Sequence, residues 1–180
     1  MPDRRHLWKG IHDAEWVKGG VRFEAEIGQT PSVPGRALEI KVELTNTAVG
    51  HKFPTYVTPK VFVRGALLDN GGNIIAGTQQ ERVIGWDARF EGGKWKEYFD
   101  TRIGPGETFR ANFRWPLPGQ AKKIRTWVEV YPDYFYHDHF YPAYLKDQAL
   151  SLQGRKLIER ALLDSGRTPY TLFDKVFTLE

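Results

Sequence analysis

Residues 36–46, RALEIKVELTN, decide the fold class of this chain. Apolar and charged side chains alternate along this stretch, with Leu38, Ile40, Val42 and Leu44 on one side and Glu39, Lys41 and Glu43 on the other. Successive side chains of a β-strand point to opposite faces of the sheet, so the alternation predicts a strand with one buried and one solvated face.

Two more stretches follow the same pattern, residues 107–115 (ETFRANFRW) and 122–132 (KKIRTWVEVYP). In the second of these we expect Trp127 on the face opposite to the core, together with charged neighbours. The three stretches together predict one apolar core, made of Leu38, Ile40, Val42, Leu44, Phe109, Phe113, Ile124, Val128 and Val130.

Weaker alternation predicts further strands over residues 21–27, 60–68, 73–77, 80–86, 95–101 and 171–179. Clusters of Gly and Pro separate several of these segments and are typical of turns. Short strands at this spacing favour an all-β fold. We expect an immunoglobulin-like antiparallel β-sandwich of seven to nine strands, with a short N-terminal arm and a C-terminal helix.

Two segments have helical features. Residues 12–20 predict a short helix, with Asp13 as its N-cap and with Trp16 and Val17 facing inward. Residues 151–165 carry apolar side chains, among them Leu157, at helical spacing, and Gly166 follows them. We therefore divide the chain into residues 1–20, an arm and short helix that contact a partner, and residues 21–180, a sandwich domain that includes the second helix.

The composition fits one globular domain and excludes several kinds of site. The chain has 180 residues, 41% of them hydrophobic, and its net charge of +4 is spread along the sequence, which argues against a nucleic-acid partner. It has no Cys, which excludes a thiol nucleophile, a Cys-ligated zinc and covalent haem attachment through C-x-x-C-H within this chain. We expect no membrane span, and the start MPDRRHLWKG lacks the apolar region of a signal peptide.

The common catalytic motifs are absent, so we expect no enzymatic activity. The sequence contains neither G-x-S-x-G, nor a P-loop, nor H-E-x-x-H, nor a dinucleotide fingerprint. One alternative remains in YHDHF, because His137 and His139 would share a face of an extended segment and offer two ligands to a metal-dependent enzyme. The other interpretation is that both histidines lie in an aromatic surface loop, residues 131–144.

The remaining histidines are His6 and His12 near the N-terminus and His51 in NTAVGHKFPT. His51 follows the strand that ends at Asn46, and Pro54 gives the loop a restricted course. A loop histidine of this kind either faces solvent, bonds to backbone or serves as a ligand.

Four segments of the chain resemble the C-terminal β-sandwich portion of some multihaem c-type cytochromes. They are residues 4–27, residues 44–55 with the motif NTAVGHKFPT, residues 103–109 (IGPGETF) and residues 157–180. In such cytochromes, histidines outside the C-x-x-C-H motifs are distal axial ligands of haems. The resemblance therefore implies that His6, His12 and His51, in that order, bind haem iron.

This chain departs from those cytochromes because it has no C-x-x-C-H motif. The resemblance then implies haem c that is held covalently by a partner chain, a multihaem c-type cytochrome, in a hetero-oligomer that transfers electrons in the periplasm or outside the cell. The chain would be a separate subunit, a fragment, or a relative that has lost haem binding.

An axial histidine needs one unprotonated ring nitrogen for the iron and an acceptor for the other. For His12 we expect Asp13 as that acceptor. We expect residues 1–12 to reach onto the partner. The alternative function is a haem-free module that binds carbohydrate or protein through its many Trp and Tyr rings.

Overall fold

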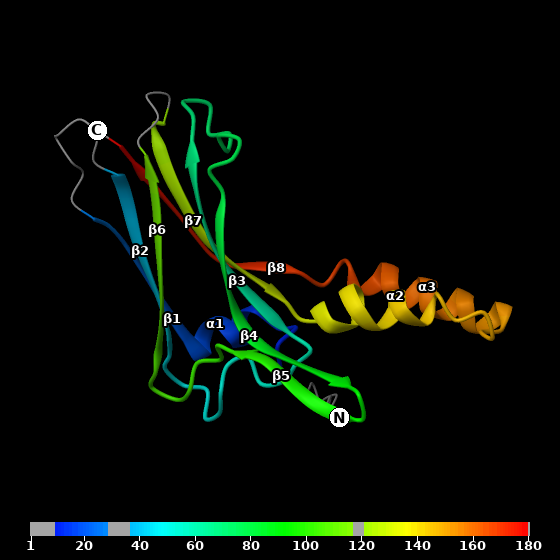
Figure 1. Cartoon of the computed structure of the whole chain (residues 1–180). Helices are drawn as coiled ribbons and strands as arrows, with labels where there is room; N and C mark the ends of the chain where they lie inside the picture. Colours follow the sequence, from blue (N-terminus) through cyan, green and yellow to red (C-terminus); the bar gives the residue numbers. More distant parts are fainter. Residues whose placement is uncertain (1–9, 29–36, 117–120, 180) are drawn as a thin grey trace, which may run out of the picture.

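The computed structural model describes residues 10–28, 37–116 and 121–179. They form eight strands and four helical segments (Figure 1). In chain order these are α1 (Ala14–Gly20), β1 (Val21–Ile27), β2 (Ala37–Asn46), β3 (Lys60–Leu68), β4 (Gln80–Glu91), β5 (Lys94–Asp100), β6 (Thr108–Pro116), β7 (Lys123–Tyr131), the π-helical turn η1 (Tyr136–Phe140), α2 (Tyr141–Tyr144), α3 (Leu152–Ser165) and β8 (Tyr170–Thr178).

The strands make two antiparallel sheets, which confirms the predicted β-sandwich. One sheet has the order β1-β2-β6 and the other the order β5-β4-β3-β7-β8. The chain crosses between the sheets after β2, β5 and β6, as in immunoglobulin-like sandwiches. Among the described residues the eight strands fall within the predicted seven to nine.

The core lies between the two sheets and contains the predicted alternating residues. Leu38, Ile40, Phe113 and Ile124 are fully buried, as are Val128 and Val130. Phe109 is only partly buried, because β6 is the edge strand of its sheet and Phe109 lies close to the strand's start. The alternation therefore predicted correctly which side of these strands faces the core, but it overestimated the burial of Phe109 on the edge strand β6.

The prediction that Trp127 lies on a solvated face is wrong, because Trp127 is buried although it lies on the outer face of β7. β7 is an inner strand, flanked by β3 and β8, and the guanidinium of Arg125 lies over the Trp127 ring at 4.6 Å from its centroid. Arg125 is in turn paired with Asp174 on β8. Long charged side chains of an inner strand cover an aromatic ring that an isolated alternating pattern assigns to solvent.

Other expectations fail for local reasons. Residues 73–77 form no strand; they fold back in a turn in which Ile74 makes a single bridge to Leu68. Trp16 is 60% exposed, whereas Val17, its neighbour on α1, is buried as predicted. Leu157 is exposed, because α3 contacts the rest of the chain along a different face.

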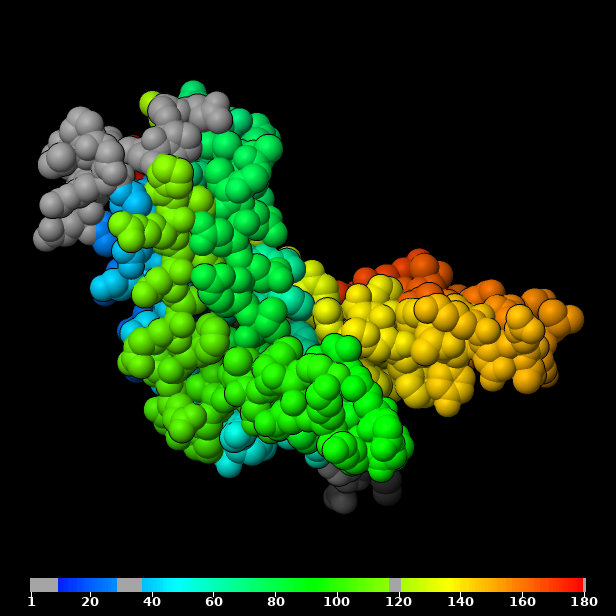
Figure 2. Space-filling model, viewed as in Figure 1, coloured from blue at the N-terminus to red at the C-terminus, as the bar shows by residue number. Residues whose placement is uncertain are grey.

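The aromatic stretch 131–144 is the largest difference from expectation. After β7 the chain turns into η1 and α2, and these pack against α3, which follows them. The two helical layers form an arm that projects from one end of the sandwich, visible in yellow and orange in Figure 1 and as a narrow extension in Figure 2. Contacts between aromatic rings, for example the tilted pair Phe140 and Tyr144 with centroids 4.5 Å apart, stabilise the helical form.

Candidate functional site

The loop that follows β2 is built around the side chain of Asn46. This side chain is fully buried and uses all its hydrogen-bonding groups: the amide nitrogen donates to the carbonyl oxygens of His51 (2.9 Å) and Ile103 (3.1 Å), and the amide oxygen accepts from Val49 N (2.9 Å). A buried amide must find such partners, so Asn46 holds the backbone on both sides of the loop in one arrangement.

The same loop is fastened to α1 and to the strand pair behind it. The backbone N–H groups of Thr47 and Ala48 both donate to the carbonyl oxygen of Gly20, at 3.1 Å each. Phe53 and Ile103 exchange two backbone hydrogen bonds of 2.8 Å. A Cβ on Gly20 would lie 2.7 Å from the Val49 side chain, so a glycine at position 20 permits the close approach of helix and loop.

An ion-pair network supports the loop from the other side. Asp100 accepts from Arg102 at 2.8 Å and from Lys52 at 2.9 Å, and Arg102 also donates to the carbonyl oxygen of Thr55. The hydrogen bonds from Arg102, with a smaller contribution from Lys52, hold the pKa of the Asp100 carboxyl far below its usual range. The carboxylate is therefore charged throughout the physiological pH range and keeps the residues that flank His51 in place.

His51 itself is exposed, with its ring oriented by its own loop. Its Nδ1 lies 3.0 Å from the carbonyl oxygen of Lys52 and 3.2 Å from Oγ1 of Thr55. A carbonyl oxygen only accepts, so Nδ1 carries a proton and is the donor of this hydrogen bond. Within the part of the chain that the structure describes, Nε2 has no hydrogen-bond partner.

A cavity of about 520 Å³ lies where His51 meets α1. Its walls come from α1, including Trp16 and Val17, and from the loop, including Phe53 and Pro54. Indole, phenyl and prolyl rings make this wall largely apolar, with the imidazole of His51 as a polar group on it. The sequence motif NTAVGHKFPT is therefore a folded unit that presents one histidine beside an apolar hollow.

The other two predicted site residues are placed differently. His12 lies just before α1, and its Nε2 is 3.0 Å from Oδ2 of Asp133. The predicted acceptor Asp13 instead caps α1 by accepting from Trp16 N. Neither His12 nor Asp13 lines the cavity beside His51. His6 lies outside the described residues.

Residues 10–12 are held by their own chain. The hydroxyl of Tyr170 donates to the carbonyl oxygen of Ile11 at 2.7 Å, and the Ile11 side chain packs against the core. That the N-terminal arm, residues 1–12, reaches onto a partner stays a prediction: residues 10–12 contact their own chain, and residues 1–9 lie outside the described residues.

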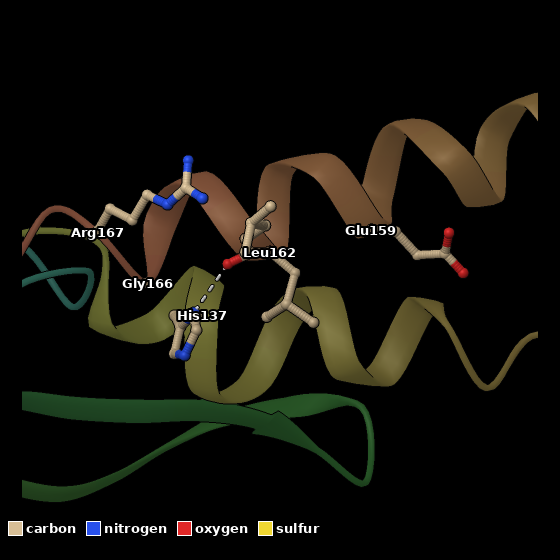
Figure 3. Close-up of a pocket in the computed structure, with 6 residues that line it drawn as sticks. His137, Glu159, Leu162, Gly166 and Arg167 are labelled. Atoms are coloured by element: carbon tan, nitrogen blue, oxygen red, sulfur yellow. Dashed lines mark hydrogen bonds between the residues drawn. The ribbon is translucent and has the colours of Figure 1, made fainter.

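The interpretation of His137 and His139 as an extended metal-binding pair is wrong. Both residues belong to η1, where successive side chains turn around the helix axis, so the two rings do not share a face. Nδ1 of His137 contacts the carbonyl oxygen of Leu162 on α3 (3.1 Å), as Figure 3 shows, and also Ser165 Oγ (3.2 Å). A cavity of about 480 Å³ runs along α3 beside this ring.

Gly166 has a packing role at this contact. A Cβ there would lie 2.8 Å from Cε1 of His137, so the glycine that ends α3 also admits the imidazole. His139 contacts the rings of Tyr134 and Phe135 instead. Among the described residues, no three His, Cys, Asp or Glu side chains are grouped as a metal site would require.

Comparisons with known proteins give structural matches and no match of sequence. No family model matches the chain, and no curated protein matches its sequence. A penta-heme cytochrome c552 from Thermochromatium tepidum superposes with a TM-score of 0.63 and 14% sequence identity, over 97% of this chain and 43% of the cytochrome. The putative ApaA protein from Bordetella pertussis reaches a TM-score of 0.35 at 13% identity, over 88% and 91% of the two chains.

The fold of this chain is therefore shared with a part of a multihaem cytochrome. At 14% identity the likeness establishes the fold alone, and the chain spans less than half of that cytochrome's length. In the described residues no helix is both long enough and apolar enough to cross a membrane.

Proposed function

We propose that this chain is a non-catalytic, haem-associated electron-transfer subunit or domain, in which His51 is a distal axial ligand to haem c held by a partner chain. The observation that supports this most is the state of the His51 ring. Nδ1–H is directed to a carbonyl oxygen, Nε2 has no hydrogen-bond partner among the described residues, and the residue lines an apolar cavity. Metal-binding histidines are commonly oriented in this way, by a hydrogen bond from the ring nitrogen that does not bind the metal.

The residues around His51 fit a haem in chemical type. A porphyrin needs apolar contact on its faces, which the exposed ring of Trp16 offers, while the buried Phe53 and Pro54 form the wall beside it. Bound there, haem would supply one-electron transfer, and filling both axial positions with imidazole favours electron transfer over ligand activation. The loop contributes an imidazole whose Nδ1 is already held by a hydrogen bond, so that Nε2 is the ring nitrogen left for the iron.

On these contacts we propose His51 ahead of His6 and His12, in contrast to the order that the resemblance implies. For His12 to bind iron through Nε2, its contact with Asp133 must first break. The other ring nitrogen, Nδ1, is the less accessible ligand because it lies closer to Cβ and the backbone. We therefore propose His51 as the first ligand to test and keep His12 and His6 as predictions. By its link to haem c, the proposal also includes a multihaem c-type cytochrome partner and a periplasmic or extracellular location.

The test uses the full chain and a haem peptide, a short peptide that carries one covalent c-type haem with a single open axial position. Binding to a protein histidine converts the haem from high spin to low spin, which the visible spectrum reports. Asn places its amide close to the position of Nδ1 and has no counterpart to Nε2, so His51→Asn keeps the bond to the Lys52 carbonyl and removes the ligand. We expect this variant to lose the low-spin species while its far-UV circular dichroism is unchanged.

The control is His139→Asn, which changes an exposed histidine away from the cavity and should bind like the unaltered chain. Variants of His6 and His12 complete the series. If the haem peptide stays high-spin with the unaltered chain, or stays low-spin with all three of His6, His12 and His51 replaced, the axial-ligand proposal is wrong.

A second candidate function is a haem-free binding module, favoured by exposed rings on the β4–β5 hairpin. Trp95 is 71% exposed and Phe90 lies against it, with ring centroids 5.7 Å apart. Such rings stack on sugar faces or anchor protein interfaces. Retention of the chain on a polysaccharide matrix, abolished by Trp95→Ala and not by His51→Asn, would support this function over the first.

A further inference from the structure

A third cavity, of about 240 Å³, lies on the far side of β3 from the core, between that strand, the β4–β5 hairpin and the start of the helical arm. Four aromatic rings line it: Phe62 from β3, Phe99 from β5, and Tyr134 and Phe135 from the segment before η1. Cavities lined by aromatic rings around a few polar groups are typical of small-molecule sites.

Lys60 is the polar group at the base of this cavity, and its surroundings are unusual for a lysine. The residue is only 6% exposed. Its Nζ donates to the carbonyl oxygens of Val57 and Trp86, both at 2.8 Å. Gly85 makes room for it, because a Cβ there would lie 2.5 Å from the Lys60 side chain. The amine is therefore held in a fixed position by the backbone.

No carboxylate of the described residues lies within ion-pair distance of this ammonium group. Two of its three N–H bonds are directed to carbonyl oxygens, and the centroid of the Tyr134 ring lies 5.6 Å from Nζ. A buried cation without a counter-ion is costly, since its hydration has been lost and only partly replaced. A bound anion would provide the missing charge.

The neighbouring charges leave the cavity with a positive surplus. Asp87 is the acidic residue on its wall, and Arg89 holds that carboxylate with two hydrogen bonds of 3.1 and 2.7 Å. Burial lowers the pKa of Lys60 to about 8, Asp87 raises it, and Arg102 and Arg89 lower it further. At neutral pH the amine is still mostly protonated, so the site attracts an anion.

We propose that this cavity binds a small carboxylate that carries a flat aromatic ring, with the carboxylate on the ammonium group of Lys60 and the ring among Phe62, Phe99, Tyr134 and Phe135. The two halves of the ligand follow from the two halves of the site. The charge requires an anion, the rings require a flat apolar body, and the volume limits the ligand to a single small ring system. This site is separate from the cavity beside His51 and does not depend on haem.

Isothermal titration of the full chain with benzoate tests the proposal. Benzyl alcohol keeps the ring and lacks the charge, acetate keeps the charge and lacks the ring, and benzylamine reverses the charge. We expect benzoate to bind at least about tenfold more tightly than any of the three. Equal binding of benzoate and benzyl alcohol, or no binding of benzoate at millimolar concentration, would overturn the proposal.

Two variants locate the binding. Lys60→Met should remove the preference for benzoate over benzyl alcohol. Phe99→Ala should weaken both ligands, whereas the control Phe90→Ala, on the same hairpin but outside the cavity, should weaken neither. If Lys60→Met does not fold, the comparison of Phe99→Ala with Phe90→Ala still decides, because benzoate that binds both variants equally well is not in this cavity.

Discussion

The side-chain amide of Asn46 donates to the carbonyl oxygen of His51 at 2.9 Å, across a loop that joins the two sheets of the sandwich. The residue that opens the motif NTAVGHKFPT thus fixes the backbone of the residue proposed to bind iron. Within this loop, the buried side-chain amide of Asn46 holds the backbone of His51. This contact explains why an asparagine and a histidine occur together in one short motif.

Replacing Asn46 with Ala should destabilise the fold and the loop together. Three hydrogen bonds are lost, and the carbonyl oxygen of Ile103 loses a buried donor. We expect a loss of about 2–3 kcal/mol in the free energy of unfolding by urea. Asn112→Ala, at an exposed position of β6, is the control and should change stability by less than about 0.5 kcal/mol. Equal effects of the two substitutions would contradict the assigned role.

Asp100→Asn should destabilise the chain in a pH-dependent way. Hydrogen bonds from Arg102, then Lys52, lower the pKa of Asp100 in the folded state, so its carboxylate stabilises the fold at pH values above the unfolded pKa of about 3.9. We expect a deficit of about 1–2 kcal/mol at pH 7 that shrinks as the pH falls below about 4. Urea unfolding at several pH values measures it.

The matched control for this variant is Asp174→Asn, which removes a similar carboxylate from Arg125 in a more exposed pair. A surface pair of this kind contributes less than about 1 kcal/mol. A deficit for Asp100→Asn that stays constant down to the lowest pH studied would show that the charge of Asp100 is not the cause.

Lys60 gives a prediction of the same sign in a higher pH window. Burial lowers its folded-state pKa from 10.5 to about 8, so the unfolded chain binds more protons between these pH values and the native state gains stability as the pH rises through this window. The groups that face Lys60 are Asp87 and Arg89 on β4, Arg102 after β5, and Tyr134 and His139 on the arm. Lys60→Met lacks this rise in stability. The free energy of unfolding of the variant, relative to that of the native sequence, should therefore fall as the pH is raised from 8 to 10.5. Parallel pH profiles of the two proteins would refute this.

Gly65→Ala should overpack the core. A Cβ at position 65 would lie 2.8 Å from the ring of Phe113, which crosses from the opposite sheet. We expect a loss of about 1–3 kcal/mol, seen as a lower melting temperature. Adding Phe113→Leu should cost less in the Gly65→Ala background than alone, because the smaller side chain relieves the clash. Gly19→Ala, in a helix with open space around it, should be neutral or slightly stabilising.

The sequence by itself determined which side of the three strongest strands faces the core. Alternation in residues 36–46, 107–115 and 122–132 predicted which side chains face the core, because the period of a strand is a local property of the backbone and Leu38, Ile40 and Phe113 need no distant information to share a face. The N-cap Asp13 and the helix that follows Ser151 are local in the same sense, since each cap bonds to an N–H three residues away.

The tertiary structure alone decided what depends on residues far apart in the chain. Trp127 is buried because Arg125 and Asp174 cover it, and the segment around His137 is helical because α3 packs against it. The same holds for the candidate sites. Asp133 rather than Asp13 contacts His12, and Lys60 is enclosed by strands and an arm that follow it in sequence. A short motif contains the histidine that a loop presents and the neighbours that orient its ring, but the cavity beside it arises only when the loop and α1 meet.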